Sequence, residues 1–119
     1  MVTITVYKDK ASRRIKLTAE GHARAGDPGR DPVCAGISAM MIGYAKTVMV
    51  AAQTGLVNEE QTKVNVGGRP GQGHIETVCL TEEAYNRRVY AMMPAELFFQ
   101  GLQESKPNHV RILCRPCGG

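Results

Sequence analysis

The segment from Asp31 to Ala52 constrains the fold of this chain more than any other part of it. Asp31 is a favoured N-cap residue, and Pro32 suits the first helical position, where its missing N–H costs nothing. Apolar residues then recur at intervals of three and four, the spacing of one face of an α-helix; they are Val33, Ile37, Met40, Met41, Tyr44, Val48 and Ala52. We expect this helix to end near Gly55. It needs another apolar layer to cover it.

Alternation of apolar and polar residues on both sides of the helix predicts that the second layer is a sheet. Residues 2–7 and 15–20 alternate with a period of two, which is typical of a hairpin with one buried face. Residues 62–66 and 74–80 predict a second hairpin around a glycine-rich turn. Residues 110–114 alternate again and predict a final strand.

A second helix is expected between the second hairpin and the last strand. Thr81 is a capping residue, and Glu82 and Glu83 follow it near the positive end of the helix dipole. Its apolar positions are Tyr85, Val89, Met92, Met93, Leu97 and Leu102. Pro94 lies inside this pattern and is expected to kink or split the helix.

The expected order is therefore strand-strand-helix-strand-strand-helix-strand. Short hairpins favour a mainly antiparallel sheet, and two amphipathic helices favour a layer on one of its faces. The fold class is an α+β two-layer sandwich. At 119 residues and 43% apolar content, the chain suits one domain over residues 1–119, with a frayed tail over residues 115–119.

Composition narrows the class of protein. No run approaches the ~18 apolar residues of a membrane span, and the strand-like start has no signal-peptide segment, so a cytoplasmic location is expected. Free thiols are favoured over disulfides for the four cysteines, Cys34, Cys79, Cys114 and Cys117. The formal charge of +4 is ordinary for a small domain, although it would help an approach to RNA.

Two residues with reactive side chains flank the loop before the first helix. His22 follows the second strand, and Cys34 occupies the third helical position. The free N–H groups and dipole of a helix start favour a thiolate, and a thiol of lowered pKa beside an imidazole can carry out covalent acyl transfer. The alternative is that Cys34 is a small buried hydrophobe, the commonest fate of a free cysteine.

Four neighbouring residues are candidates for supporting roles. Asp31 either only caps the helix or also orients His22 or holds substrate. Ser38 lies one turn beyond the cysteine and either lines a cleft or allows close helix packing. Gly21 is expected to meet a backbone requirement where the strand turns. Backbone N–H groups at the helix start, including that of Ala35, are candidates for an oxyanion site.

The order Gly-His-Ala, a loop, then Asp-x-Val-Cys-Ala-x-x-Ser-Ala over residues 31–39 resembles the ribosomal-processing cysteine protease family, Prp. Pro32 and Gly36 depart from the more usual aliphatic residue and alanine of that pattern, and Arg24 and Arg30 add positive charge to the loop. The resemblance implies the fold described above and an endopeptidase with a cysteine nucleophile, a histidine base and no cofactor.

The same resemblance implies a substrate and an assembly. A family member of this kind is a bacterial homodimer that removes the N-terminal extension of a large-subunit ribosomal protein during ribosome assembly. Its target is an extended peptide with paired phenylalanines before the cut. Weak ribosome association is compatible with this role, and neither a membrane nor DNA is an expected partner.

Two other functions remain open from the sequence. One is a non-catalytic ribosome- or RNA-associated basic domain, although few aromatic residues are present to stack on bases. The other is a metal-binding protein that uses Cys114 and Cys117, with His109 and Cys79 as further ligands. The Cys-x-x-Cys pair supplies two ligands where structural zinc takes four.

Overall fold

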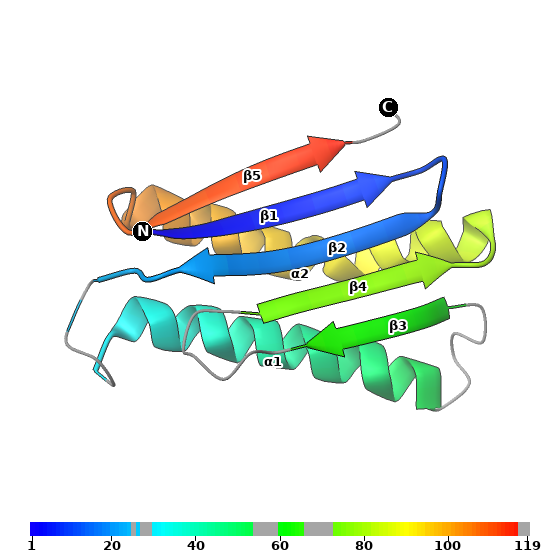
Figure 1. Ribbon diagram of the computed structural model, residues 1–119, viewed down its shortest axis with the longest axis horizontal. Coiled ribbons are helices and arrows are strands. Elements are labelled where there is room, and N and C mark those ends of the chain that lie inside the picture. The colour runs from blue at the N-terminus through cyan, green and yellow to red at the C-terminus, as the bar shows by residue number, and fades with distance from the viewer. Residues whose placement is uncertain (25, 27–29, 54–59, 66–72, 117–119) are drawn as a thin grey trace.

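The computed structural model of the protein describes residues 1–24, 26, 30–53, 60–65 and 73–116. The elements follow the predicted order, β1 (Val2–Asp9), β2 (Arg14–Gly21), α1 (Pro32–Gln53), β3 (Glu60–Asn65), β4 (Gly73–Cys79), α2 (Glu82–Ser105) and β5 (Val110–Pro116). Five strands form a sheet and two helices cover one side of it (Figure 1). The predicted α+β sandwich is confirmed.

The sheet has the strand order β3-β4-β2-β1-β5. The pairs β1–β2, β2–β4 and β3–β4 are antiparallel, as short hairpins predict. In contrast, β5 runs parallel to β1, with a register from Val2 opposite Val110 to Lys8 opposite Pro116. The last strand therefore forms the edge next to the first (Figure 1).

The core lies between the sheet and the helix layer. Alternate residues of β1 point into it, and Val2, Ile4 and Val6 are at most 1% exposed. The helices supply the opposite side, with fully buried residues that include Ile37, Met41 and Val48 of α1 and Met92 and Phe99 of α2. Burial of these side chains is the main stabilising contribution to such a fold.

Helix α1 is more apolar than the sequence inspection predicts. Over Pro32–Ala51 it is long and apolar enough to cross a membrane, by length and composition alone. Its inward side packs in the core, where Val33, Ile37 and Tyr44 are buried. Packing against the sheet therefore accounts for part of this apolar content, and the outward side of the helix accounts for the rest.

The start of α2 agrees with the prediction, and of the two outcomes expected at Pro94 the split does not occur. The Thr81 hydroxyl accepts the Ala84 N–H at 3.1 Å, as expected of an N-cap. The helix continues through Pro94 as one element. Proline frees the carbonyl one turn earlier, that of Tyr90, and Tyr90 is 74% exposed. Water can hydrogen-bond to the freed carbonyl, so the predicted split is not required.

Some boundaries differ from the prediction. Strand β1 continues to Asp9, whose carboxylate accepts the Ala11 N–H at 3.1 Å and the Ser12 hydroxyl at 2.7 Å, and so closes the turn locally. Strand β5 continues through Pro116, into the segment expected to be a frayed tail. The predicted helix end at Gly55, the glycine-rich turn and residues 117–119 lie outside the described residues.

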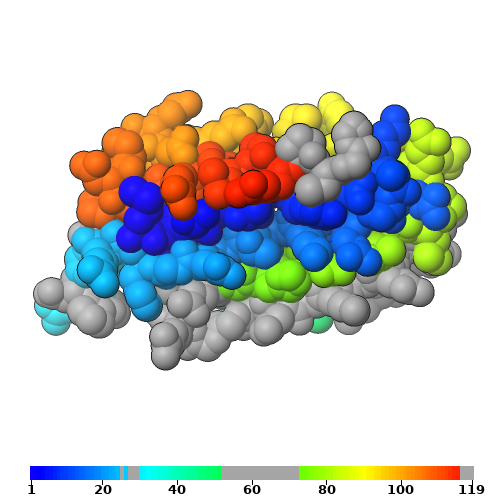
Figure 2. Space-filling model, turned by 45° about the horizontal axis from the view of Figure 1, so that its top comes forward, coloured from blue at the N-terminus to red at the C-terminus, as the bar shows by residue number. Residues whose placement is uncertain are grey.

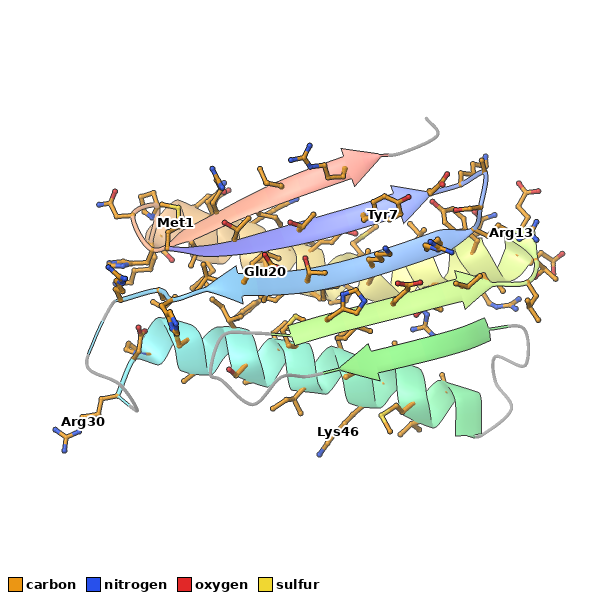
Figure 3. The ribbon with its side chains drawn as sticks, in the orientation of Figure 1. Met1, Tyr7, Arg13, Glu20, Arg30 and Lys46 are labelled. Atoms are coloured by element: carbon orange, nitrogen blue, oxygen red, sulfur yellow. The ribbon has the colours of Figure 1, made fainter. Side chains whose placement is uncertain are left out.

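The other face of the sheet is open. In Figure 2 the strands β5, β1 and β2 cross it as neighbouring bands, and in Figure 3 the Tyr7 side chain lies on it. Glu76 lies 3.6 Å from each of three basic groups, those of Arg14, Lys16 and His74. The Lys16 ammonium also lies 5.4 Å from the centre of the Tyr7 ring. This part of the open face is polar and has more basic than acidic groups.

Candidate active site

The first turn of α1 is built around the Asp31 carboxylate. Its Oδ1 atom accepts the N–H groups of Val33 at 2.9 Å and Cys34 at 3.1 Å. The Asp31 carbonyl accepts the Ala35 N–H at 3.0 Å, which is the first backbone bond of the helix. The predicted cap and the third helical position of Cys34 are confirmed.

Gly21 ends β2 at the same end of the molecule. Its φ is +102°, and a Cβ atom there would lie 2.4 Å from the Met1 carbonyl oxygen. The predicted backbone requirement for glycine is confirmed, because any side chain would be both strained and obstructed. The next residue, His22, is exposed, and its carbonyl accepts a hydrogen bond from the Met1 amino group at 2.5 Å. Figure 3 shows Met1 at this end of the sheet.

Ala23 connects this segment to the cysteine. Its side chain is 1% exposed, and its backbone amide hydrogen-bonds the Cys34 sulfur. Its carbonyl oxygen lies 2.7 Å from Nδ1 of His109, just before β5. The sequence indicates His109 only as a candidate metal ligand. No local pattern could have placed it here, because 86 residues separate it from Ala23.

The prediction of a lowered pKa for Cys34 is wrong for this arrangement. The residue is only 6% exposed, and burial raises the pKa of its thiol. The charge and side-chain hydrogen bond of Asp31 raise this pKa further, whereas the Ala23 amide and the terminal amine lower it. Burial is the largest of these causes and sets the direction of the shift. The thiol is therefore mainly protonated at neutral pH.

The two expected reactive side chains come to the same end of the sandwich without touching. Within the described residues, no hydrogen bond joins the His22 ring to Cys34; the histidine is exposed and the thiol is buried. The candidate oxyanion donors are also in use. Asp31 holds the amides of Val33 and Cys34, and the amide of Ala35 is part of the helix.

Two further α1 residues border this region. Ser38 lies one turn beyond Cys34 and is half-buried. A Cβ atom added at Gly36 would lie 3.7 Å from the Phe98 ring of α2, an ordinary contact, so packing does not demand glycine there. Phe98 is 37% exposed. An accessible aromatic ring therefore lies beside the helix turn that carries the cysteine.

The remaining thiols lie elsewhere. Cys79 is buried at the end of β4, and Cys114 is exposed on β5; neither forms a disulfide within the described part of the chain. Across the described residues no group of three or more histidine, cysteine or acidic side chains is placed to hold a metal ion. Cys117 lies outside that part of the chain.

Comparison with known families decides the class of this site. The profile of the family described as cysteine protease Prp matches residues 1–111. The chain belongs to this family. Its members are cysteine-type peptidases, so the resemblance of the histidine and cysteine segments to Prp and the expectation of a cysteine-type endopeptidase are both confirmed.

Individual relatives support the family assignment. The ribosomal processing cysteine proteases Prp of Staphylococcus aureus strains Mu50 and NCTC 8325 are each 24% identical over 112 residues, covering 94% of this chain and 97% of theirs. The crystal structure of S. aureus Prp with a covalently linked product peptide is 25% identical, with a TM-score of 0.67 over 97% of this chain and 100% of the other.

A more distant structure shares the fold. The crystal structure of SMU.848 from Streptococcus mutans is 21% identical, with a TM-score of 0.60, and covers 98% of this chain and 95% of that one. The overall fold is thus shared with this structure and with the S. aureus Prp structure.

Proposed function

We propose that this Prp-family peptidase removes an N-terminal extension from a ribosomal protein, with Cys34 as nucleophile, His22 as general base and no cofactor. The observation that carries the proposal is the seating of Cys34 in the capped first turn of α1, with the backbone after His22 hydrogen-bonded to its sulfur. The S. aureus relatives are ribosomal processing proteases, and one was crystallised with a covalently linked product peptide, which accords with a covalent step.

The chemistry follows from these two side chains. His22 takes the thiol proton as the Cys34 sulfur attacks the peptide carbonyl, which forms a C–S bond and an oxyanion. Collapse of this intermediate breaks the C–N bond, and His22 gives its proton to the departing amine. Water then attacks the thioester, releases the carboxylate product and restores the thiol.

The proposed reaction requires two local movements from the arrangement described above. The His22 ring must approach the sulfur, because it is exposed and makes no hydrogen bond to Cys34 among the described residues. The amides of Val33 and Cys34 must also leave the Asp31 carboxylate if they are to hold the oxyanion. Asp31 is therefore a cap in the resting enzyme and gives way to the substrate carbonyl.

The proposed substrate is an extended peptide with two phenylalanines before the cut. Phe98 offers an accessible aromatic surface beside Gly36, and Ser38 lies on the same helix one turn beyond the nucleophile. Apolar burial contributes about 25 cal/mol per Å², so an aromatic side chain that packs here contributes a few kcal/mol. The absence of a side chain at Gly36 leaves room for this approach.

The proposed homodimer has a candidate surface on the outer side of the helix layer. Six large apolar residues are exposed there, Ile42, Met49 and Val50 of α1 and Tyr90, Met93 and Leu97 of α2. Monomers rarely expose large contiguous apolar patches, so we propose that a second copy covers this face. Size-exclusion chromatography with light scattering would measure the oligomeric state. The variant Leu97→Glu should give a folded monomer.

We further propose that the protein acts in the cytoplasm, where ribosomal proteins are made, and that its open sheet face makes weak contact with the ribosome. The basic groups of Arg14 and Lys16 beside the carboxylate of Glu76 support such a contact. Added salt should weaken ribosome co-sedimentation and leave the cleavage of short peptides intact.

The deciding experiment uses two peptides that differ only before the cut. One contains Phe-Phe-Ala within the N-terminal extension of the ribosomal precursor, and the other has Ala-Ala-Ala in its place. Wild-type protein should cut the first after the second phenylalanine and leave the second nearly intact, as read by mass spectrometry. Cys34→Ser should cut neither, and the matched control Cys114→Ser should behave as wild type.

The outcomes separate the parts of the proposal. Equal cleavage of both peptides would contradict the proposed specificity but keep the nucleophile. Cleavage by Cys34→Ser would contradict the nucleophile. An intact precursor, an unreactive Cys34 and tight RNA binding would instead favour the non-catalytic RNA-associated domain.

A further inference from the structure

His109 occupies the turn between α2 and β5, far along the chain from the proposed site. Its backbone is fixed on both sides, since its carbonyl accepts the Val2 N–H at 2.8 Å and its N–H donates to the Lys106 carbonyl at 3.0 Å. Its ring is partly buried, and Nδ1 lies 2.7 Å from the Ala23 carbonyl oxygen. A carbonyl oxygen can only accept, so Nδ1 carries the hydrogen.

The residue that His109 holds sits between the proposed base and the proposed nucleophile. Ala23 directly follows His22, whose carbonyl is anchored by the Met1 amino group. The Ala23 amide hydrogen-bonds the Cys34 sulfur, and its methyl group is buried. Each polar group on either side of the Ala23 α-carbon therefore has a partner, and His109 supplies one of them.

The backbone just after Ala23 requires such a partner. Arg24 has a φ of +56°, a left-handed conformation that is unfavourable for a residue other than glycine. The carbonyl that accepts from His109 belongs to the peptide bond joining Ala23 to Arg24. The hydrogen bond from the ring thus holds the peptide at the point where the chain turns away from the site.

We propose that His109 is a positioning residue for the Cys34–His22 pair. Its ring N–H holds the Ala23 carbonyl and so fixes the His22–Ala23 segment against the first turn of α1. This inference rests on the proposed function, because it assigns His109 a role toward those two side chains. It goes beyond that function by adding a second histidine, from the turn before β5, to the residues on which the site depends.

The consequence is carried through the backbone rather than through charge. Without the His109 ring, Ala23 loses an anchor and its amide no longer stays on the Cys34 sulfur, so the thiolate loses a hydrogen-bond donor. The charged groups that act on the thiol, the Asp31 carboxylate and the terminal amine, are unchanged by this loss. The Cys34 thiol should become harder to ionise, and His22 should be held less firmly.

The experiment compares His109→Ala, His109→Asn and the matched control His74→Asn. An asparagine amide N–H can donate from nearly the position of Nδ1, so it preserves the bond that alanine removes. His74 lies on the open face of the sheet, with a side chain 41% exposed and paired with Glu76, so it tests the loss of a histidine elsewhere. The first readout is iodoacetamide alkylation of Cys34 as a function of pH, with peptide mapping to separate the cysteines.

His109→Ala should slow Cys34 alkylation at pH 7 about threefold to tenfold and move the profile to higher pH. Its kcat should fall by more than its KM rises. His109→Asn should restore most of the alkylation rate and most of kcat, and His74→Asn should match wild type in both. Each variant is first checked for its Tm, and if His109→Ala does not fold, His109→Asn with a wild-type profile would support the inference.

Two results would overturn it. One is a folded His109→Ala with wild-type alkylation and kcat, whatever its Tm. The other is a folded His109→Asn that loses as much as alanine does. The alkylation readout needs no substrate, so the two proposals fail separately. If the wild-type protein cuts no peptide but His109→Ala still shifts the Cys34 alkylation profile, only the proposed function is contradicted.

Discussion

The two helices of this protein begin with the same device. A side-chain oxygen of the N-cap accepts the N–H of the third helical residue at 3.1 Å in both, from Asp31 to Cys34 in α1 and from Thr81 to Ala84 in α2. Both third residues are buried, at 6% and 0% exposure. Locally, Cys34 and Ala84 occupy equivalent positions.

The two starts differ in how they use the positive end of the helix dipole. Glu82 and Glu83 place two acids in the first turn of α2, which stabilises the helix. The first turn of α1 has none, and the carboxylate of its cap lies beside a thiol instead. The first turn of α2 carries two acids and an alanine, whereas the first turn of α1 carries a thiol beside the carboxylate that accepts its amides. A cap by itself therefore does not distinguish the two starts; the proposed site differs by the Ala23 backbone and by His22, which precedes it.

The largest expected effect on activity comes from giving α1 the alanine that α2 has at its third helical position. Cys34→Ala should abolish peptide cleavage because no sulfur remains to form the acyl intermediate. The fold should persist, since alanine is accommodated at the equivalent position of α2. Single-turnover cleavage and thermal unfolding measure the two halves of this prediction. Residual turnover above about one part in a thousand of wild type would contradict the assignment of the nucleophile.

His22→Ala should lower kcat about a hundredfold or more, the usual loss when a general base is removed. It should also slow Cys34 alkylation near neutral pH, since the thiol then lacks its proton acceptor. His74→Ala, which removes a histidine from the open face, is the matched control and should leave both measurements unchanged. A wild-type alkylation profile in His22→Ala would show that the two side chains are not coupled.

Asp31→Asn separates capping from charge, because asparagine caps a helix as well as aspartate does. The Asp31 charge holds the pKa of the Cys34 thiol up, so its removal lowers that pKa and increases the thiolate fraction at neutral pH. We expect Cys34 alkylation at pH 7 to become about threefold faster, with the profile moved to lower pH. Stability should change little. Slower alkylation in this variant would mean that Asp31 assists the thiolate.

Thr81→Ala should lower the free energy of unfolding by about 1 kcal/mol through loss of the cap. The activity should stay at the wild-type level, because this helix start takes no part in the chemistry. Urea unfolding followed by circular dichroism gives the stability. If Thr81→Ala lowered both the peptidase activity and the alkylation rate of Cys34, the conclusion that the start of α2 takes no part in the chemistry would be wrong.

The smallest effect is expected from the cysteines outside the proposed site. Changing Cys114 and Cys117 to serine should leave activity and Tm nearly unchanged, because Cys114 is an exposed free thiol on the edge strand β5. Elemental analysis of both proteins provides the control. Stoichiometric zinc in wild type that is absent from the variant would promote the metal-binding function.

The sequence was sufficient where the physics is local. The Asp31 cap, the Thr81 cap and the glycine requirement at Gly21 each depend on a few neighbouring residues, and the structure has all three. Period-two alternation likewise predicted the strands and their inward faces, since one face of each strand must meet the helices. The hairpins then left few antiparallel arrangements of the sheet.

It was insufficient where distant segments meet. The pKa of Cys34 is raised because tertiary packing buries the thiol, a contribution that no first-turn pattern contains. His109 reaches Ala23 only because β5 pairs in parallel with β1. Pro94 also lies inside a helix that continues as one element, which its local sequence did not decide.

The parallel pairing of β1 with β5 also determines the order in which this edge of the sheet can form. Every other element of the sandwich precedes β5 along the chain, so β1 has no partner on that edge until β5 has been synthesised. Pairings across most of a chain are slow to form because loop closure must come before their contacts. His109, whose ring holds the Ala23 carbonyl, directly precedes this strand and is synthesised 86 residues after Ala23. During translation the chain therefore contains Cys34 well before it contains the histidine and the strand that complete this end of the sandwich.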